Sequence, residues 1–154
     1  MRTIDDLIAD NAALAALPPA QREVIAGCGR NRVFAPGEYL LREGAPADTF
    51  YVLRSGHVAL EAFSPQRGAM TIETLHDGDL LGWSWLVAPH RTMFDARSIG
   101  ESHVIVFDGA CLRGKLDGDP ALASALLRVF MAVVVERLQN TRVRLLDLYG
   151  KEPR

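Results

Sequence analysis

A chain of 154 residues with 49% hydrophobic and 23% charged residues has the size and composition of one globular domain. Its net charge of −2 gives no electrostatic attraction of the whole surface for nucleic acid. The first ten residues lack the basic start and apolar run of a signal peptide, and the longest apolar window, 126–135, is too short to cross a bilayer. We therefore expect a cytoplasmic protein without a membrane segment.

Residues 1–30 have the pattern of short helices. The Pro18-Pro19 pair interrupts the pattern, and Pro19 suits the first position of a second helix that ends at Gly27 or Gly29. Apolar residues recur at helical intervals along the segment, at Ile4, Leu7, Ile8, Leu14, Leu17, Val24 and Ile25.

Residues 31–118 have the pattern of an all-β region. Short runs rich in aliphatic and aromatic residues alternate with glycine-containing breaks such as Pro36-Gly37 and Ser55-Gly56. Strand signals about every 8–12 residues, with turn residues between them, indicate an antiparallel sandwich or roll. The runs that we expect to be strands are 39–41, 50–53, 57–63, 70–75 and 103–107.

A long helix is predicted over 119–149. Asp119 is a good N-cap residue, and Pro120 suits the first helical position. The next glycine or proline is Gly150, which permits roughly 29 helical residues, or about 43 Å at 1.5 Å per residue.

The predicted helix carries two apolar faces, which leaves two interpretations open. A heptad seam is formed by Leu127, Met131, Val134, Leu138, Thr141, Leu145 and Leu148. The first half has a second apolar face made by Leu126, Val129, Phe130 and Val133. The helix could lie only on its own sheet, or one face could cover the sheet while the seam meets a partner helix. The second face favours a homodimer, and we expect Arg137, Arg142 and Arg144 to form a solvated face.

The cysteines and histidines give no indication of a metal site or of catalysis. Cys28 and Cys111 are too few for a disulfide scaffold, and we expect them to be reduced thiols. The four histidines are scattered without metal-ligand spacing, and no nucleophile–base arrangement or carboxylate pair is visible. We therefore expect neither a metal nor an enzyme.

The order of glycines and apolar residues carries a family resemblance. The stretch from Phe34-Ala-Pro-Gly37 to Gly56-His-Val58, followed by Gly78-Asp79-Leu80-Leu81-Gly82 and a long helix, resembles the cyclic nucleotide-binding domain. That domain occurs in the catabolite activator protein and FNR-like regulators, in protein kinase A regulatory subunits and in gated ion channels. The resemblance covers roughly residues 15–148. It implies an α+β, mainly β, fold: an eight-stranded antiparallel β-roll, jelly-roll-like, with N-terminal helices and a long C-terminal helix.

Residues 78–92, which we call the cassette, correspond to the segment that binds phosphate in this family. Gly82 lets the backbone approach a ligand, and Trp83, Ser84 and Trp85 form a helical turn whose free N–H groups favour an anion. The family cassette closes with arginine followed by serine or threonine, which Arg91-Thr92 matches. The predicted ligand-binding residues are Gly82, Trp83, Ser84, Trp85, Arg91 and Thr92.

The cassette departs from the family pattern at Trp83. This position usually holds a glutamate that accepts hydrogen bonds from the ribose 2′-hydroxyl, and its loss should weaken nucleotide binding by about 1–3 kcal/mol. The tryptophans Trp83 and Trp85 could stack on a flat ligand or could fill the pocket. The Gly82-Trp-Ser-Trp-Leu86 string resembles a subgroup of small bacterial proteins that consist of this domain alone.

These observations predict a sensor domain. Only four residues follow Gly150, so we expect no DNA-recognition helix in this chain. The leading hypothesis is a regulatory domain that binds a small anionic ligand, cyclic AMP, cyclic GMP or a related compound, and signals through its C-terminal helix. The alternative is a degenerate dimeric module that binds no nucleotide and instead contacts an unknown protein partner.

Overall fold

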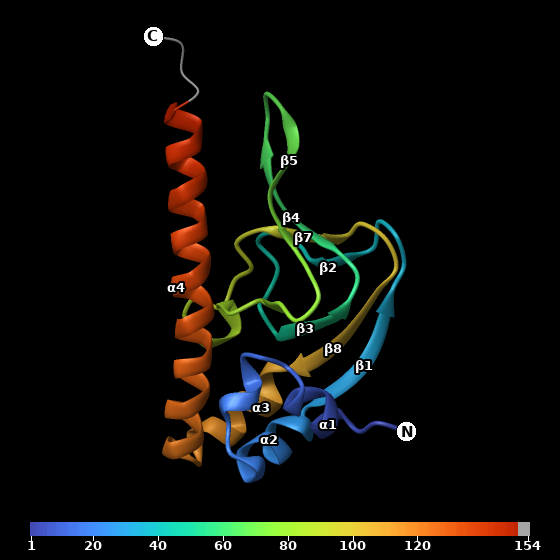
Figure 1. Ribbon diagram of the computed structural model, residues 1–154, viewed down its shortest axis with the longest axis vertical. Coiled ribbons are helices and arrows are strands. Elements are labelled where there is room, and N and C mark those ends of the chain that lie inside the picture. Colours follow the sequence, from blue (N-terminus) through green and yellow to red (C-terminus); the bar gives the residue numbers. More distant parts are fainter. Residues whose placement is uncertain (151–154) are drawn as a thin grey trace.

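A computed structural model describes residues 1–150 of the chain. Helix α4 runs along the whole length of the molecule, with the other helices packed near its N-terminal end (Figure 1). The helices are α1 (Ile4–Ala9), α2 (Pro19–Ala26), α3 (Gly109–Asp117) and α4 (Pro120–Gly150), with 3₁₀ turns η1 (Leu14–Ala16) and η2 (Ser84–Leu86). The strands are β1 (Gly29–Phe34), β2 (Tyr39–Leu41), β3 (Thr49–Ser55), β4 (Val58–Ser64), β5 (Gly68–Leu75), β6 (Leu80–Leu81), β7 (Asp95–Ser98) and β8 (Ser102–Asp108).

The eight strands of residues 1–150 form two four-stranded sheets. One sheet has the order β1-β8-β3-β6 and the other has the order β2-β7-β4-β5, and all neighbouring strands are antiparallel. The expected eight-stranded antiparallel roll with flanking helices is therefore confirmed. The hairpin of β4 and β5 extends beyond the roll beside the distal half of α4 (Figure 1).

Strands β3 and β8, at the centre of one sheet, are buried on both faces. In β3, Phe50 and Val52 face the helices, while Tyr51 and Leu53 face the interior of the roll. Strand β8 alternates in the same way, so that Ile105 and Phe107 belong to the helical core. Covering both faces explains why these strands are continuous apolar runs rather than alternating ones.

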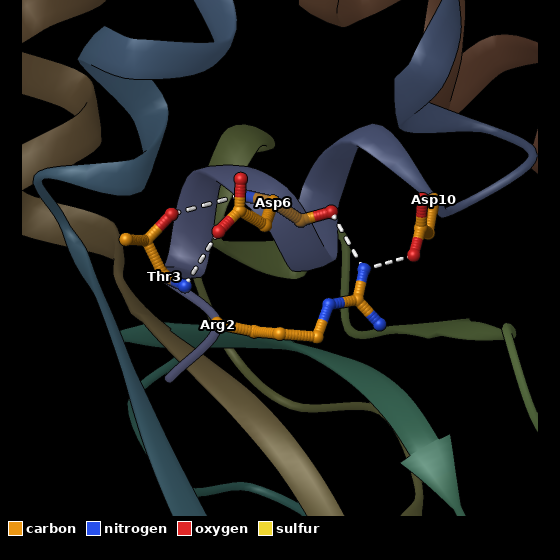
Figure 2. Close-up of polar contacts among 4 residues, drawn as sticks. All are labelled: Arg2, Thr3, Asp6 and Asp10. Atoms are coloured by element: carbon orange, nitrogen blue, oxygen red, sulfur yellow. Dashed lines mark hydrogen bonds and ion pairs between the residues drawn. The ribbon is translucent and has the colours of Figure 1, made fainter.

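Helix α1 begins with a capping box (Figure 2). The backbone N–H of Asp6 donates to Thr3 Oγ1 at 3.1 Å, and that of Thr3 donates to Asp6 Oδ2 at 2.8 Å. The hydrogen bond from the Thr3 backbone lowers the pKa of the Asp6 carboxyl. The Arg2 guanidinium contacts the Asp10 carboxylate at the other end of the helix. As predicted, Pro19 occupies the first position of α2.

The C-terminal third of the chain holds two helices, of which one was not predicted. Asp119 caps α4 as expected, because its Oδ1 accepts from the Leu122 N–H at 3.1 Å. Helix α3 was missed, although Asp108 marks its start by accepting from the Cys111 N–H at 3.0 Å. Within the described residues no helix has both the length and the hydropathy that a membrane span requires.

The two apolar faces of α4 have different surroundings. Leu126, Val129 and Phe130 are buried against the rest of the fold. The seam positions, in contrast, are 46% to 66% exposed at Leu127, Met131, Leu138, Leu145 and Leu148. One of the two predicted roles of α4 is thus observed, because one face covers the domain's own core. The seam positions named above are exposed, as a partner helix would require.

Cys28 and Cys111 are joined by a disulfide, which corrects the expectation of two reduced thiols. The bond links the residue before β1 to the first turn of α3, and it spans 83 positions of sequence. The pairing was not visible in the sequence because the second cysteine lies in the unpredicted helix α3.

Reducing this bond should lower the free energy of unfolding by about 2–4 kcal/mol, because the closed loop restricts the unfolded chain. Urea denaturation with and without reductant measures the difference. A Cys28→Ser, Cys111→Ser variant is the control and should no longer respond to reductant. Equal midpoints for oxidised and reduced protein, with free thiols verified by titration, would contradict the expectation.

Trp85 lies at the centre of the helical core. Its ring stacks on Phe50, with centroids 5.5 Å apart and an interplanar angle of 16°, and meets the edge of Phe130 at 5.8 Å. The side chain is fully buried. The three aromatic rings connect the cassette, strand β3 and helix α4.

Replacing this ring should therefore cost stability. We expect Trp85→Ala to lower the free energy of unfolding by about 3–5 kcal/mol, because it opens a cavity among Phe50 and Phe130. Trp83→Ala, two residues earlier and only partly buried, is the matched control and should cost less than half as much. Chemical denaturation of both variants provides the comparison, and similar losses would argue against this assignment.

Candidate functional site

Within the cassette, the chain turns away from β6 at Gly82, a position whose backbone conformation requires glycine. Gly82 follows β6 and has a φ of +88°, a conformation that side-chain-bearing residues rarely adopt. A Cβ there would lie 3.2 Å from the carbonyl oxygen of Thr49. The glycine thus turns the chain sharply into Trp83 and η2.

A pocket of about 470 Å³ opens between the cassette and helix α4. Its walls come from the roll, from the cassette, from the residues just after the cassette and from the middle of α4. The lining residues are Leu41, Leu60, Ile72, Glu73, Leu81, Gly82, Trp83, Ser84, Thr92, Met93, Phe94, Val134, Arg137, Leu138 and Thr141. The group of three or more His, Cys, Asp or Glu side chains that a metal ion needs does not occur in residues 1–150.

Four of the six predicted site residues lie in this pocket. Gly82, Trp83, Ser84 and Thr92 line it together, although ten positions of sequence separate the first from the last. Thr92 is buried, and its backbone makes two hydrogen bonds: its C=O accepts from the Gly44 N–H at 2.8 Å, and its N–H donates to the Ala45 C=O at 2.9 Å. The end of the cassette is thus tied to the loop between β2 and β3.

Trp85, the fifth predicted residue, is a core residue and not a pocket-lining one. Its packing against Phe50 and Phe130 corrects the idea that both tryptophans face a ligand. Trp83 alone presents its indole to the pocket. Trp83 is only partly buried, at the margin of the core that encloses Trp85, a difference that the sequence spacing did not reveal.

Arg91, the sixth predicted residue, is exposed and does not line the pocket. Its Nη1 donates to the carbonyl oxygen of Gly44 at 3.4 Å. Arg97, the next arginine along the chain, lies on β7 and forms an ion pair with the buried carboxylate of Glu61, at 2.8 Å and 3.2 Å. The hydrogen bond with Glu61 raises the pKa of Arg97. Neither arginine faces the pocket in this structure.

The arginine that does line the pocket is Arg137 of α4. Only 9% of the residue is exposed, which corrects its assignment to a solvated face. One guanidinium nitrogen, Nη2, donates to the carbonyl oxygen of Leu80. The guanidinium carbon lies 5.0 Å from the centre of the Trp83 ring, a cation–π contact. Helix α4 is thereby tied to the strand that leads into the cassette.

The second guanidinium nitrogen, Nη1, is buried and has no hydrogen-bond partner among the described residues. Burial lowers the pKa of Arg137, and the carboxylates of Glu73, Asp79 and Glu136 oppose that shift. A buried positive group with an unused donor stabilises an anion placed beside it. The electrostatics of the pocket therefore favour a negatively charged group at Nη1.

The sequence does contain a signal that Arg137 is buried. The buried face of α4 runs through Leu126, Phe130 and Val133 at spacings of 4 and 3, and a further step of 4 reaches Arg137. The residue therefore continues a buried face and does not belong to the solvated one. The prediction of a solvated face placed Arg137 with Arg142 and Arg144 because of their shared charge, and it overlooked this spacing.

Comparison with known proteins places this geometry in a family. The model of the cyclic nucleotide-binding domain matches residues 31–119. A Geobacter metallireducens protein described as cyclic nucleotide-binding has a solved structure that superposes with a TM-score of 0.79 at 27% identity, covering 90% of this chain and 99% of that one. The N-terminal domain of a transcriptional regulator from Streptomyces coelicolor superposes with a TM-score of 0.68 at 26% identity, covering 91% and 95%.

Curated relatives are regulators. A CRP-like cAMP-activated global transcriptional regulator from Mycobacterium tuberculosis is 27% identical over 115 residues, which is 75% of this chain and 50% of that protein. The chain thus spans about half the length of this relative. A cAMP-dependent protein kinase regulatory subunit from Hypocrea atroviridis is 31% identical over 81 residues, 53% of this chain and 16% of that protein. Because the family model matches more than half of the chain, this protein belongs to the cyclic nucleotide-binding domain family.

Proposed function

We propose that this domain binds a small anionic ligand in the pocket between cassette and α4, and that binding alters the position of α4. Cyclic AMP and cyclic GMP, or related compounds, are the first ligands to consider, because of the family. The proposal places the protein in the cytoplasm. The Gly82-Trp-Ser-Trp-Leu86 cassette suggests the subgroup of bacterial proteins built from this domain alone.

The observation that carries the proposal is the shared wall of the pocket. Trp83 and Ser84 of the cassette face Val134, Leu138 and other residues of α4 across it. A ligand that fills the space touches both elements at once, so its binding energy differs between arrangements of the cassette and the helix. Such a difference is what a ligand needs to shift a conformational equilibrium.

Arg137 supplies a direct link between the two elements. Its Nη2 holds the Leu80 carbonyl, two residues before Gly82, while its side chain lies against Trp83. An anion drawn to Nη1 would act on a residue that belongs to α4 and contacts the entrance of the cassette. We therefore expect ligand binding to order the cassette and α4 together.

The output of the domain is proposed to be a homodimer whose geometry depends on α4. The exposed heptad seam supports this, since Leu127, Met131, Leu138, Leu145 and Leu148 leave an apolar stripe without cover in a single chain. Two apolar members of the seam, Val134 and Leu138, also line the pocket. One helix would then connect ligand and partner.

The alternative is a dimeric interaction module that binds no nucleotide. Two observations favour it: Trp83 stands where the family carries a ribose-binding glutamate, and Arg91 points away from the pocket. Under this alternative the seam and an unknown protein partner carry the function. Direct titration separates the two hypotheses.

Titration of the protein with cyclic AMP and cyclic GMP by calorimetry should give saturable binding of one nucleotide per chain. Arg137→Gln should weaken that binding by about 1.5–3 kcal/mol, because the buried Nη1 of Arg137 is the donor that the phosphate would use. Arg67→Ala, in the turn between β4 and β5, is the control and should bind normally. Absence of heat at millimolar nucleotide would favour the interaction module.

The dimer is tested separately with charges in the seam. A Leu145→Glu, Leu148→Glu variant should be monomeric by light scattering where the unmodified protein is dimeric, because paired carboxylates would face each other. Gln139→Glu, Asn140→Glu adds the same charge on the outer face of the helix and should stay dimeric. A dimer that survives the seam variant would show that another surface holds the chains together.

A further inference from the structure

The walls of the pocket are mainly aliphatic and aromatic. Leu41, Leu60 and Leu81 come from the roll, and Met93, Phe94 and Leu138 complete the enclosure. A cyclic nucleotide presents ribose hydroxyls and ring nitrogens, each of which loses water on entering and needs a polar partner. The character of the walls instead suits a ligand whose body is apolar.

Arg137 provides the single positive charge of the pocket. It is nine-tenths buried, and its Nη1 is a buried donor without a partner among the described residues. The ion pairs found among residues 1–150 do not include it. An anionic group on the ligand would satisfy this donor with a charge-assisted hydrogen bond.

The surrounding carboxylates limit the charge that the pocket accepts. Glu73 of β5 lines the same pocket, and Asp79 and Glu136 also act on Arg137 through space. One negative charge beside Nη1 is favoured, whereas a second would be repelled by Glu73. The ligand should thus be a monoanion, with its charge at one end.

We propose that the pocket binds an unbranched aliphatic monocarboxylic acid, with its carboxylate accepting from Arg137 Nη1 and its chain lying among the apolar walls. The inference rests on the proposed ligand-binding function and names its ligand class. The carboxylate would meet the guanidinium beside Trp83, and the methylenes would run between the roll and α4. The cavity of about 470 Å³ is large enough for a medium-length chain such as decanoate.

The test is a calorimetric titration of the full-length protein with hexanoate, octanoate and decanoate, with 1-decanol as the neutral analogue. Decanoate should bind once per chain. Affinity should rise about fourfold per added methylene as apolar surface is buried. Decanol should bind at least about tenfold more weakly, because it cannot form the charged hydrogen bond.

Two pairs of variants locate the carboxylate. Arg137→Gln should abolish the preference for decanoate over decanol, and Arg142→Gln, on the exposed part of the same helix, should preserve it. If Arg137→Gln does not fold, substitutions at Met93 test the charge preference instead. Met93 lines the pocket but is 64% exposed, so we expect its variants to fold. Met93→Glu should weaken decanoate binding more than decanol binding, whereas Met93→Gln should affect the two ligands equally.

Each outcome has a defined meaning. Decanoate binding that depends on chain length and on Arg137 supports the proposal. Equal binding of decanoate and decanol, or binding unchanged in Arg137→Gln, overturns it in favour of a nonspecific apolar groove. Cyclic nucleotide binding without decanoate binding overturns the ligand class but leaves the proposed function standing. Failure of both ligand types overturns both and favours the interaction module.

Discussion

The stacking of Trp85 between strand β3 and helix α4 is the contact on which the site depends. Phe50 holds the ring from the roll, and Phe130 holds it from the helix. Because all three side chains are buried, sliding one element past another would open a cavity in a closely packed core. The cassette is therefore fixed at Trp85, while Trp83 is left free to form a wall of the pocket.

Arg137 is the polar counterpart of that contact. It lies two helical turns beyond Phe130, on the same face of α4, where the helix has passed the aromatic core and reached the cassette. The guanidinium donates to the Leu80 carbonyl and lies over the Trp83 ring. It therefore extends the interface between the cassette and α4 that Trp85 forms in the core. A buried charge there costs desolvation energy, and its partly unused donors make it responsive to an anion.

The roll could be predicted from the sequence because its signals are local. Turn glycines, the proline at the start of α2 and the Asp119 cap each act within a few residues. The features that were missed depend on distant neighbours: Cys28 meets Cys111 only through the fold, and the burial of Arg137 follows from which face of α4 the roll covers. The sequence did not show which of Trp83 and Trp85 is buried in the core, because the 3₁₀ turn that holds them is too short to produce a periodic pattern of apolar residues.

Helix α4 contributes residues to the core, to the pocket and to the uncovered part of the seam. Leu126 and Phe130 join the core, Val134 and Arg137 form the pocket, and Leu145 and Leu148 remain uncovered. Because Val134 of the pocket belongs to the same seam as Leu145 and Leu148, a ligand that moves the middle of the helix also moves the uncovered end of the seam. The energy available for this is the difference in ligand affinity between two helix positions, and contacts to α4 contribute to it directly. Ligand groups that touch the cassette alone would add affinity without adding a signal, so the residues of α4 in the pocket determine whether binding is transmitted.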